Sequence, residues 1–319
     1  MTMRAKAAPT IPSTTESEPE SRAFLVAGQK LIAPRAAPGL HLVATPIGNL
    51  GDITLRALET LAGVDVIACE DTRITHRLTE RYGISAQLKP YHEHNAAQAR
   101  PKILKKLAQG GSVALVSDAG TPLISDPGYK LVREAYDAGH DVVALPGASA
   151  VLAALALAAL PTDRFFFDGF LPAKQGARRS RLSELAAIDA TLVLFEAGSR
   201  IHNSLRDLAE VLGGREAAIC RELTKLHQEV RRAPLTTLAE TAETLETRGE
   251  FVVVIGPPDP GARMMTQDAL DTWLRDALQR DSVKDAVAQA VDISGRPRRE
   301  IYARALELAR QREADDGQD

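Results

Sequence analysis

The sequence predicts an α/β protein with two α/β domains and a small all-α helical appendage at its C-terminal end. Short apolar runs typical of buried strands alternate with helical patterns, which favours α/β layers with largely parallel strands. Loops rich in Gly and Pro follow several of these runs. Beyond the Pro- and Gly-rich linker at 257–261, residues 264–319 show only helical patterns.

Composition excludes several classes of protein. The chain has 319 residues, enough for about two domains, and 45% are apolar, which excludes a wholly disordered chain. A net charge of −3 excludes a strongly basic nucleic-acid coat protein. Only Cys69 and Cys220 are present, which excludes a disulfide scaffold. The apolar run Ala148–Leu160 is shorter than the roughly 20 residues of a membrane span. With no signal-peptide pattern near Glu16, we expect a soluble, cytoplasmic protein.

The chain is expected to divide into four parts. Residues 1–38 are rich in Ala, Pro, Ser, Thr and Glu without sustained periodicity, which predicts a disordered extension. The N-terminal α/β domain is expected over residues 39–147 and the C-terminal α/β domain over 148–260. The helical appendage then occupies residues 264–319.

Elements of the first domain follow from the spacing of apolar residues. Leucines at helical spacing predict a helix over 53–62, with Asp52 as its N-cap and Gly63 as its end. Uninterrupted apolar runs predict the strands. They lie at 41–45, 64–69, 112–117 and 141–145, with a second helix at 129–138.

The second domain begins with a helix of small residues at 149–159. Further strands are predicted at 191–195, 217–221 and 251–255, and helices at 201–212 and 238–248. In the appendage, apolar residues at helical spacing over 282–291 precede a turn at Gly295 and a second helix, which resembles a helix-turn-helix hairpin.

Three loops after predicted strands have the composition of a ligand site. The longest, Ser117–Gly128, lies between a buried-type strand and a helix, and ligands of parallel α/β folds bind beyond the carboxyl ends of strands. Residues 45–52 and 146–150 have a similar composition, which indicates a shared cleft. An ordinary βα loop also needs Gly, Pro and Asp, so composition alone leaves that alternative open. The P-loop and dinucleotide fingerprints are absent.

Seven segments resemble a known family. They are 43–54, 68–73, 91–95, 117–128, 146–150, 169–172 and 221–227. Together they resemble the tetrapyrrole-methylase-like superfamily of S-adenosylmethionine (SAM)-dependent methyltransferases. Within it they resemble the small-subunit ribosomal RNA cytidine 2′-O-methyltransferases. The resemblance covers about residues 40–257 and, more weakly, the C-terminal helices.

The resemblance implies a homodimer that binds SAM in a cleft between its two domains. It implies methylation of the ribose of a decoding-centre cytidine in 16S ribosomal RNA, on the assembled small subunit. The implied cofactor-binding residues are Pro46, Asp118, Ala119, Gly120, Leu123, Ile124, Ala148, Ser149, Phe195, Leu223 and Val254. Where the family has a Pro-His pair, this chain has Gly198 and Ser199, so no role is assigned there.

The expected chemistry needs alignment and a base rather than a metal. The sulfonium leaves as a neutral thioether, but a ribose hydroxyl is a weak nucleophile that benefits from a general base. The catalytic candidates come from the resembling segments and are Glu70, Asp71, Arg73, Glu93 and His94. Asp71 and Arg73 could equally form a structural ion pair, and Asp118 and Asp126 could be caps. His92 and His94 share one face of an extended segment without a third ligand, so RNA contact is favoured over zinc.

Two clusters of basic residues predict RNA contacts. They are Lys174, Arg178, Arg179 and Arg181 in the second domain and Arg296, Arg298 and Arg299 in the appendage. A solvated helix surface is the alternative for each. Few aromatic residues lie in either cluster, which favours a folded RNA surface over a stacked single strand.

Two other functions share part of this pattern. A porphyrinoid C-methyltransferase would have the same SAM cleft without needing the arginine-rich appendage. A non-catalytic ribosome- or RNA-binding protein would keep the fold without turnover. Intact Gly/Pro loops argue against the loss of SAM binding.

Overall fold

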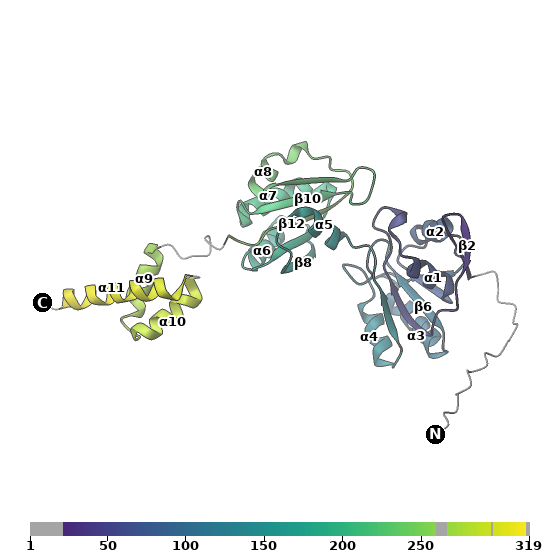
Figure 1. Ribbon diagram of the computed structural model, residues 1–319, viewed down its shortest axis with the longest axis horizontal. Coiled ribbons are helices and arrows are strands. Elements are labelled where there is room, and N and C mark those ends of the chain that lie inside the picture. The colour runs from purple at the N-terminus through teal and green to yellow at the C-terminus, as the bar shows by residue number, and fades with distance from the viewer. Residues whose placement is uncertain (1–21, 260–266, 295, 317–319) are drawn as a thin grey trace, which may run out of the picture. The chain divides into compact units, whose positions relative to one another are not determined.

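The computed structural model describes residues 22–259, 267–294 and 296–316. The chain divides into two compact units, which meet between Ala150 and Val151, and we describe each by itself (Figure 1). In the described part of the chain, no helix is both long and apolar enough to span a membrane.

Unit 1 is built on a five-stranded, all-parallel sheet with the strand order β5-β4-β6-β3-β7. The strands are β3 (Gly39–Val43), β4 (Val66–Cys69), β5 (Gln87–Pro90), β6 (Ser112–Val116) and β7 (Val142–Leu145). The helices are α1 (Leu55–Gly63), α2 (Thr72–Arg81), α3 (Ala96–Ala108) and α4 (Tyr129–Asp137). Apolar residues of α1 and α2 share one buried cluster with the sheet, and those of α3 and α4 share another. The two pairs of helices therefore cover opposite faces of the sheet.

The N-cap of α1 differs from the prediction. The Thr54 hydroxyl accepts the Ala57 N–H at 3.1 Å, and the helix begins at Leu55 rather than at residue 53. Asp52 instead ends a short 3-10 turn that starts at Leu50. Both residues are good N-caps, and the structure selects the one next to the apolar stripe.

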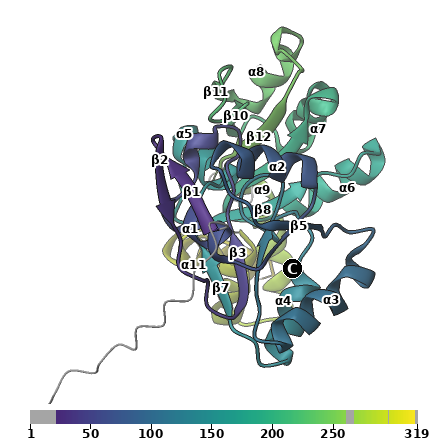
Figure 2. The ribbon, with the colours of Figure 1, turned by 90° about the vertical axis from the view of Figure 1, so that its right-hand side faces the viewer.

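The prediction of a disordered extension over residues 1–38 is wrong for its described part. β1 (Ala23–Val26) and β2 (Gln29–Ile32) form an antiparallel hairpin (Figure 2). Phe24 is buried in the same cluster as α1, and the Leu25 N–H donates to the Tyr82 carbonyl at 2.7 Å. Burial of this aromatic side chain offsets the ordering entropy of the hairpin. Residues 1–21 lie outside the described residues.

Unit 2 contains a mixed five-stranded sheet with the order β11-β10-β12-β9-β8, in which only β8 and β9 are parallel. The strands are β8 (Phe165–Phe170), β9 (Thr191–Ala197), β10 (Glu216–Arg221), β11 (Glu229–Pro234) and β12 (Glu250–Ile255). The helices are α5 (Ala150–Ala158), α6 (Gln175–Leu185), α7 (Ile201–Leu212) and α8 (Leu235–Glu240). Helices α6, α7 and α8 share one apolar cluster with the sheet.

The helix predicted at 238–248 is wrong in its bounds. α8 ends at Glu240, and a short 3-10 turn covers Ala242–Thr244. The Thr241 hydroxyl donates to the Thr237 carbonyl at 2.8 Å, and the Thr244 hydroxyl donates to the Thr241 carbonyl at 2.7 Å. Such local side-chain bonds compete with helix propagation.

The C-terminal helices have an apolar core of their own. They are α9 (Gln267–Ala277), α10 (Val283–Ser294) and α11 (Arg298–Asp316). The predicted stripe of α10 is buried at Ala286, Val287 and Ala290. Arg304 of α11 is bonded to the buried Asp271 of α9, which joins the first and last of these helices.

Candidate functional site

The topology of unit 1 predicts a crevice at the carboxyl end of β6. This strand lies between β4 and β3. The chain leaves β4 and β3 through helices on one face of the sheet, and it leaves β6 through α4 on the opposite face. Adjacent loops that diverge in this way create the crevice in which open parallel sheets bind ligands. The predicted Ser117–Gly128 loop begins there.

Three loops converge at Gly120. Its N–H donates to the Thr45 carbonyl at 3.0 Å, and the Thr45 N–H donates to the Gly120 carbonyl at 2.9 Å. An added Cβ at Gly120 would lie 3.4 Å from Ile47 Cγ2 and 3.8 Å from the Ala148 carbonyl oxygen. The loops after β3, β6 and β7 are thus brought together as predicted. Because its N–H and its carbonyl are both bonded to Thr45, Gly120 holds two of these loops together, and its contact with a cofactor stays a prediction.

The rest of the Ser117–Gly128 loop is held in an unusual conformation. Leu123 and Ser125 have positive φ values of 76° and 62°, which are costly for residues other than Gly. Ile124 remains 47% exposed. Among the other predicted residues, Ala119 is exposed, and Pro46, Ala148 and Ser149 are half-buried at the same edge of the sheet.

Carboxylates gather at the ends of β4 and β6. Asp118 Oδ1 accepts the Asp71 N–H at 3.0 Å, which joins the two strand ends. Burial, together with the charges of Asp118 and Asp126, raises the pKa of Glu70 above its usual range. Burial and neighbouring carboxylates also raise the pKa values of Asp118 and Asp126. Sequence reasoning treated Asp126 as a cap and missed its place in this acidic cluster (Glu70, Asp118, Asp126).

Asp71 differs from its neighbours because Arg73 pairs with it. Arg73 Nη2 lies 2.6 Å from Asp71 Oδ2, and Asp71 Oδ1 also accepts the Arg73 N–H at 2.8 Å, which caps α2. Hydrogen bonds from Arg73 lower the pKa of Asp71 to about 2. The ion-pair alternative for these two residues is therefore what the structure forms, and it leaves Asp71 a weak base.

The Tyr91–Asn95 turn lies beside Glu70. The Tyr91 N–H donates to the Cys69 carbonyl at 2.7 Å, next to the end of β4. Asn95 Oδ1 accepts the His92 N–H at 2.9 Å, which closes the turn. Glu93 and His94 are exposed on it. Four of the five predicted catalytic residues therefore lie in loops at the carboxyl edge of this sheet, and Arg73 lies in the first turn of α2, which starts at the same edge.

Histidines 92 and 94 lie on the same turn, with ring centroids 6.1 Å apart. Within the described residues, no three His, Cys, Asp or Glu side chains are placed to hold a metal ion.

The predicted cofactor residues of the second half lie on the sheet of unit 2. The ring of Phe195 packs edge-on against Phe167, at a centroid distance of 4.8 Å, and against Phe170, at 5.5 Å. Leu223 is buried in the loop after β10, and Val254 of β12 is fully buried. Their contacts with a cofactor stay predictions.

The segment that departs from the family pattern is tightly packed. A Cβ at Gly198 would lie 1.6 Å from the Thr247 carbonyl oxygen, so no side chain fits this position. Glu196 before it is buried and accepts Arg200 Nε at 2.8 Å. The segment thus has a structural role, and the position that holds Pro in the family must hold Gly here.

The predicted RNA contacts of α6 are largely engaged within unit 2. Arg178 is buried, and its Nη2 lies 2.6 Å from Asp207 Oδ2. The same carboxylate binds Arg179 at 2.7 Å, and Glu210 also pairs with Arg179. The prediction for Arg178 is wrong, because a guanidinium enclosed by its own unit cannot reach a phosphate. Burial acts against the charge of Asp207, but its arginine partners keep the pKa of this carboxyl low.

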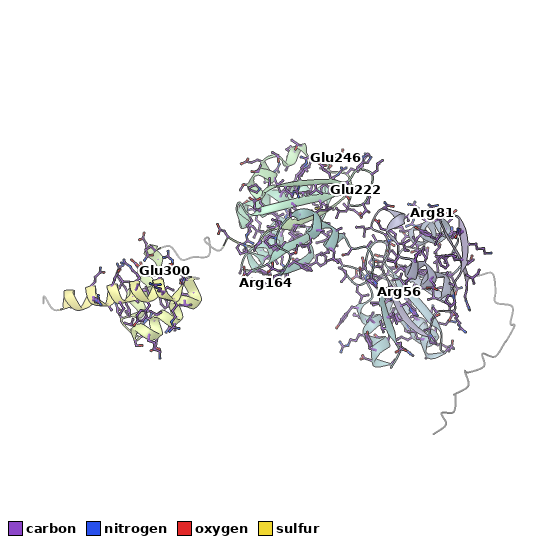
Figure 3. All side chains as sticks on the ribbon, viewed as in Figure 1. Arg56, Arg81, Arg164, Glu222, Glu246 and Glu300 are labelled. Atoms are coloured by element: carbon purple, nitrogen blue, oxygen red, sulfur yellow. The ribbon has the colours of Figure 1, made fainter. Side chains whose placement is uncertain are left out.

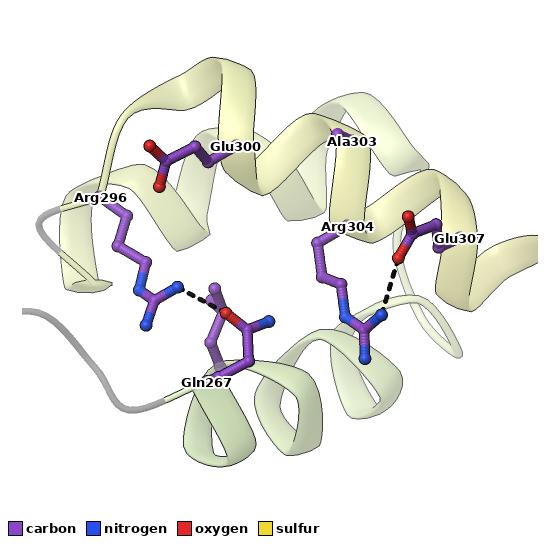
Figure 4. A pocket seen from close by; sticks show the side chains of 7 residues that line it. Gln267, Arg296, Glu300, Ala303, Arg304 and Glu307 are labelled. Carbon is purple, nitrogen blue, oxygen red and sulfur yellow. Dashed lines mark hydrogen bonds and ion pairs between the residues drawn. The ribbon is translucent and has the colours of Figure 1, made fainter.

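The remaining predicted RNA contacts differ in their surroundings. Arg181 pairs with Asp168 and, at 2.6 Å, with Glu184, while Lys174 is exposed just before α6. Arg296 Nη1 donates to Gln267 Oε1 at 2.6 Å, at one end of an open pocket between α9 and α11 (Figure 4). Arg298 and Arg299 are exposed on the first turn of α11.

Comparison with protein families gives two matches along the chain. The family of Tetrapyrrole (Corrin/Porphyrin) Methylases matches residues 39–239. The RsmI C-terminal HTH domain matches residues 265–309, over α9, α10 and most of α11.

Curated relatives match most of the chain. A protein of Mesorhizobium japonicum named "Ribosomal RNA small subunit methyltransferase I" is 50% identical over 273 residues, covering 85% of this chain and 92% of its own. A protein of Escherichia coli O157:H7 with the same name is 45% identical over 272 residues, covering 84% and 94%.

Solved structures share the fold at low identity. Diphthine synthase aligns with a TM-score of 0.54 and 17% identity, covering 68% of this chain and 89% of its own. The methyltransferase CobJ aligns with a TM-score of 0.53 and 22% identity, covering 69% and 95%. These likenesses show the fold alone.

Proposed function

The chain belongs to the tetrapyrrole methylase family, and from that premise we propose that it is a SAM-dependent methyltransferase of small-subunit ribosomal RNA. Identity of 42–50% to relatives named for that activity, over more than four fifths of the chain, is the observation that carries this proposal. The appendage supports it, since it matches a domain named after the same enzymes.

The residues around the crevice at the end of β6 fit SAM, the methyl donor. SAM supplies an electrophilic methyl group on a sulfonium, which leaves as a neutral thioether. The positive φ of 79° at Gly120 disfavours any other residue there, so position 120 puts no side chain among the three loops. The exposed residue Ala119 can offer its backbone N–H to a carboxylate, and Asp118 or Asp126 can bind an ammonium group. These are the two charged groups of the methionine part of SAM, so the residues present fit the donor.

We assign the general base to Glu70. Its raised pKa brings it closer to the working pH than an ordinary Glu, which improves a base that must take a proton from a weak nucleophile. Asp71, which its ion pair with Arg73 holds ionised, is a poorer base and instead fixes the start of α2. Glu93 and His94 lie on the neighbouring turn, where they can contact the acceptor.

We propose the ribose 2′-oxygen of a cytidine as the acceptor. A hydroxyl acceptor needs proton removal at the moment of transfer, and an acidic cluster with raised pKa values provides a group for that step. The exposed Arg298 and Arg299 give the appendage a cationic surface for phosphate. We further propose that the enzyme acts in the cytoplasm, as a homodimer, on the assembled small subunit.

An acceptor comparison tests this function. The purified full chain is incubated with methyl-labelled SAM and three acceptors: undermethylated small ribosomal subunits, naked ribosomal RNA, and a porphyrinoid precursor. We expect label in the RNA of the subunits and less on naked RNA. Label on the porphyrinoid alone would overturn the RNA proposal, and label on no acceptor despite SAM binding would favour a non-catalytic RNA-binding protein.

A further inference from the structure

Ion pairing distinguishes the arginines of α6 from two arginines of α2. Those of α6 are neutralised by Asp168, Asp207 and Glu210. On α2, by contrast, Arg77 and Arg81 are exposed, and no carboxylate in the described part of the chain pairs with either. Free guanidinium groups at a surface are available to an anionic partner.

The free arginines of α2 form a line with Arg73. Residues 73, 77 and 81 are four apart, so they lie on one side of the helix at a rise of about 6 Å per step. The opposite side is buried through Thr75, Leu78 and Thr79. We call this line the α2 stripe (Arg73, Arg77, Arg81). It begins at Arg73, which is bonded to Asp71 beside the acidic cluster, and it ends at Arg81 on the surface of unit 1 (Figure 3).

The far end of α2 is firmly held. The Tyr82 hydroxyl donates to the Leu50 carbonyl at 2.7 Å, which links the helix end to the loop after β3. The Tyr82 carbonyl accepts the Leu25 N–H of the N-terminal hairpin at 2.7 Å. The start of α2 is capped by Asp71. A helix fixed at both ends holds its backbone ready for a ligand, so binding must order only the arginine side chains.

We propose that the α2 stripe binds the ribose-phosphate backbone of the RNA next to the nucleotide being methylated. This inference rests on the proposed function. An acidic cluster at the crevice repels phosphate, so the strand needs cations close by to bring a ribose to Glu70. Guanidinium groups bind phosphate oxygens in a bidentate manner. α2 carries one acidic residue, Glu80, against three arginines.

The α3 helix offers a matched comparison. It also starts at the carboxyl edge of the sheet, but its apolar side packs in the other core cluster, on the opposite face. Lys102 and Lys105 are exposed on it. The one arginine of α3, Arg100, is paired with Glu134 at 2.8 Å. The structure therefore predicts that the two helices contribute unequally to RNA binding.

Salt-dependent binding of the full chain to undermethylated small ribosomal subunits tests the stripe. The variant Arg77→Gln/Arg81→Gln should bind about tenfold more weakly, and the slope of log Kd against log salt should fall by about one per residue. Its SAM affinity and Tm should equal those of the wild type, because neither side chain has a folding partner. Arg77→Lys/Arg81→Lys should keep most of the slope.

The α3 variant Lys102→Gln/Lys105→Gln is the charge-matched control and should bind as the wild type does. The assignment to α2 would be overturned if Arg77→Gln/Arg81→Gln kept the wild-type slope of log Kd against log salt. It would also be overturned if the α3 variant lost as much affinity for the subunits as the α2 variant. Failure of the proposed function looks different, because the wild type itself would then transfer no label to the subunits.

Discussion

Glu70 and Asp71 are neighbours in the sequence, yet their surroundings drive their pKa values in opposite directions. Burial and the carboxylates of Asp118 and Asp126 raise that of Glu70, whereas Arg73 lowers that of Asp71 to about 2. The sequence placed both residues in one candidate set. It could not rank them, because Asp118 and Asp126 lie in a loop that the sheet topology brings to Glu70 from about 50 residues away.

Replacement of Glu70 tests its role as base. Glu70→Gln should lower the methyl-transfer rate by about 10²- to 10⁴-fold and leave SAM affinity near that of the wild type. In the wild type, the ionised form of Glu70 grows as pH rises through its raised pKa, so the rate should rise over the same interval. The variant should lose this rise. Rates are measured under single-turnover conditions across the pH range.

Glu93→Gln is the matched control, since it changes an exposed carboxylate on the neighbouring turn. It should keep the pH profile of the wild type. If Glu70→Gln retains the full rate and the same pH profile, another group is the base.

Strand-to-helix loops and the local Asp71–Arg73 ion pair were predictable from the sequence, whereas ion pairs between elements far apart in the sequence were not. The glycines and prolines that follow an apolar run predict the Ser117–Gly128 loop. The N-terminal hairpin has only two four-residue strands, too short for a clear alternation against the Ala- and Pro-rich background. The arginines of α6 resembled a phosphate-binding cluster because their partners Asp168, Asp207 and Glu210 are distant in sequence.

The buried ion pair between Arg178 of α6 and Asp207 of α7 should contribute strongly to the stability of unit 2. Asp207→Ala would leave the buried Arg178 without its carboxylate, which typically costs about 3–5 kcal/mol of unfolding free energy. Glu210→Ala removes only the exposed partner of Arg179 and should cost less than about 1 kcal/mol. Urea denaturation of both variants measures the difference. An equal loss of unfolding free energy in the two variants would show that burial does not make the Arg178–Asp207 pair the stronger one.

The first turn of α11 should matter for RNA rather than for SAM. Arg298→Gln/Arg299→Gln removes two exposed charges from a helix whose core lies on its other side. RNA affinity should fall and its salt slope should drop by about two, while SAM affinity is unchanged. Calorimetry measures the SAM affinity, and RNA binding at several salt concentrations measures the RNA affinity and its salt slope. An unchanged RNA affinity would show that this turn is a solvated surface that does not bind RNA.

At the scale of the whole molecule, the chain joins two α/β units to a helical appendage with its own core. Alternating strand and helix patterns predicted largely parallel strands, which is confirmed for the first unit, where each crossover needs a helix, and is wrong for the second, where only β8 and β9 are parallel. The mixed order of the second sheet was harder to predict, since its antiparallel strands are as apolar as parallel ones. The resemblance supplied the acceptor, which no spacing of residues in the chain encodes.

The identity of the methylated nucleoside tests most directly the proposal that the acceptor is the 2′-oxygen of a cytidine and that Glu70 is the base. Small subunits from cells that lack this enzyme are incubated with the purified chain and SAM, and their RNA is digested to nucleosides for mass spectrometry. We predict that 2′-O-methylcytidine appears with the wild type and is strongly reduced with Glu70→Gln. A methyl group on a base, or no new methylated nucleoside, would contradict it.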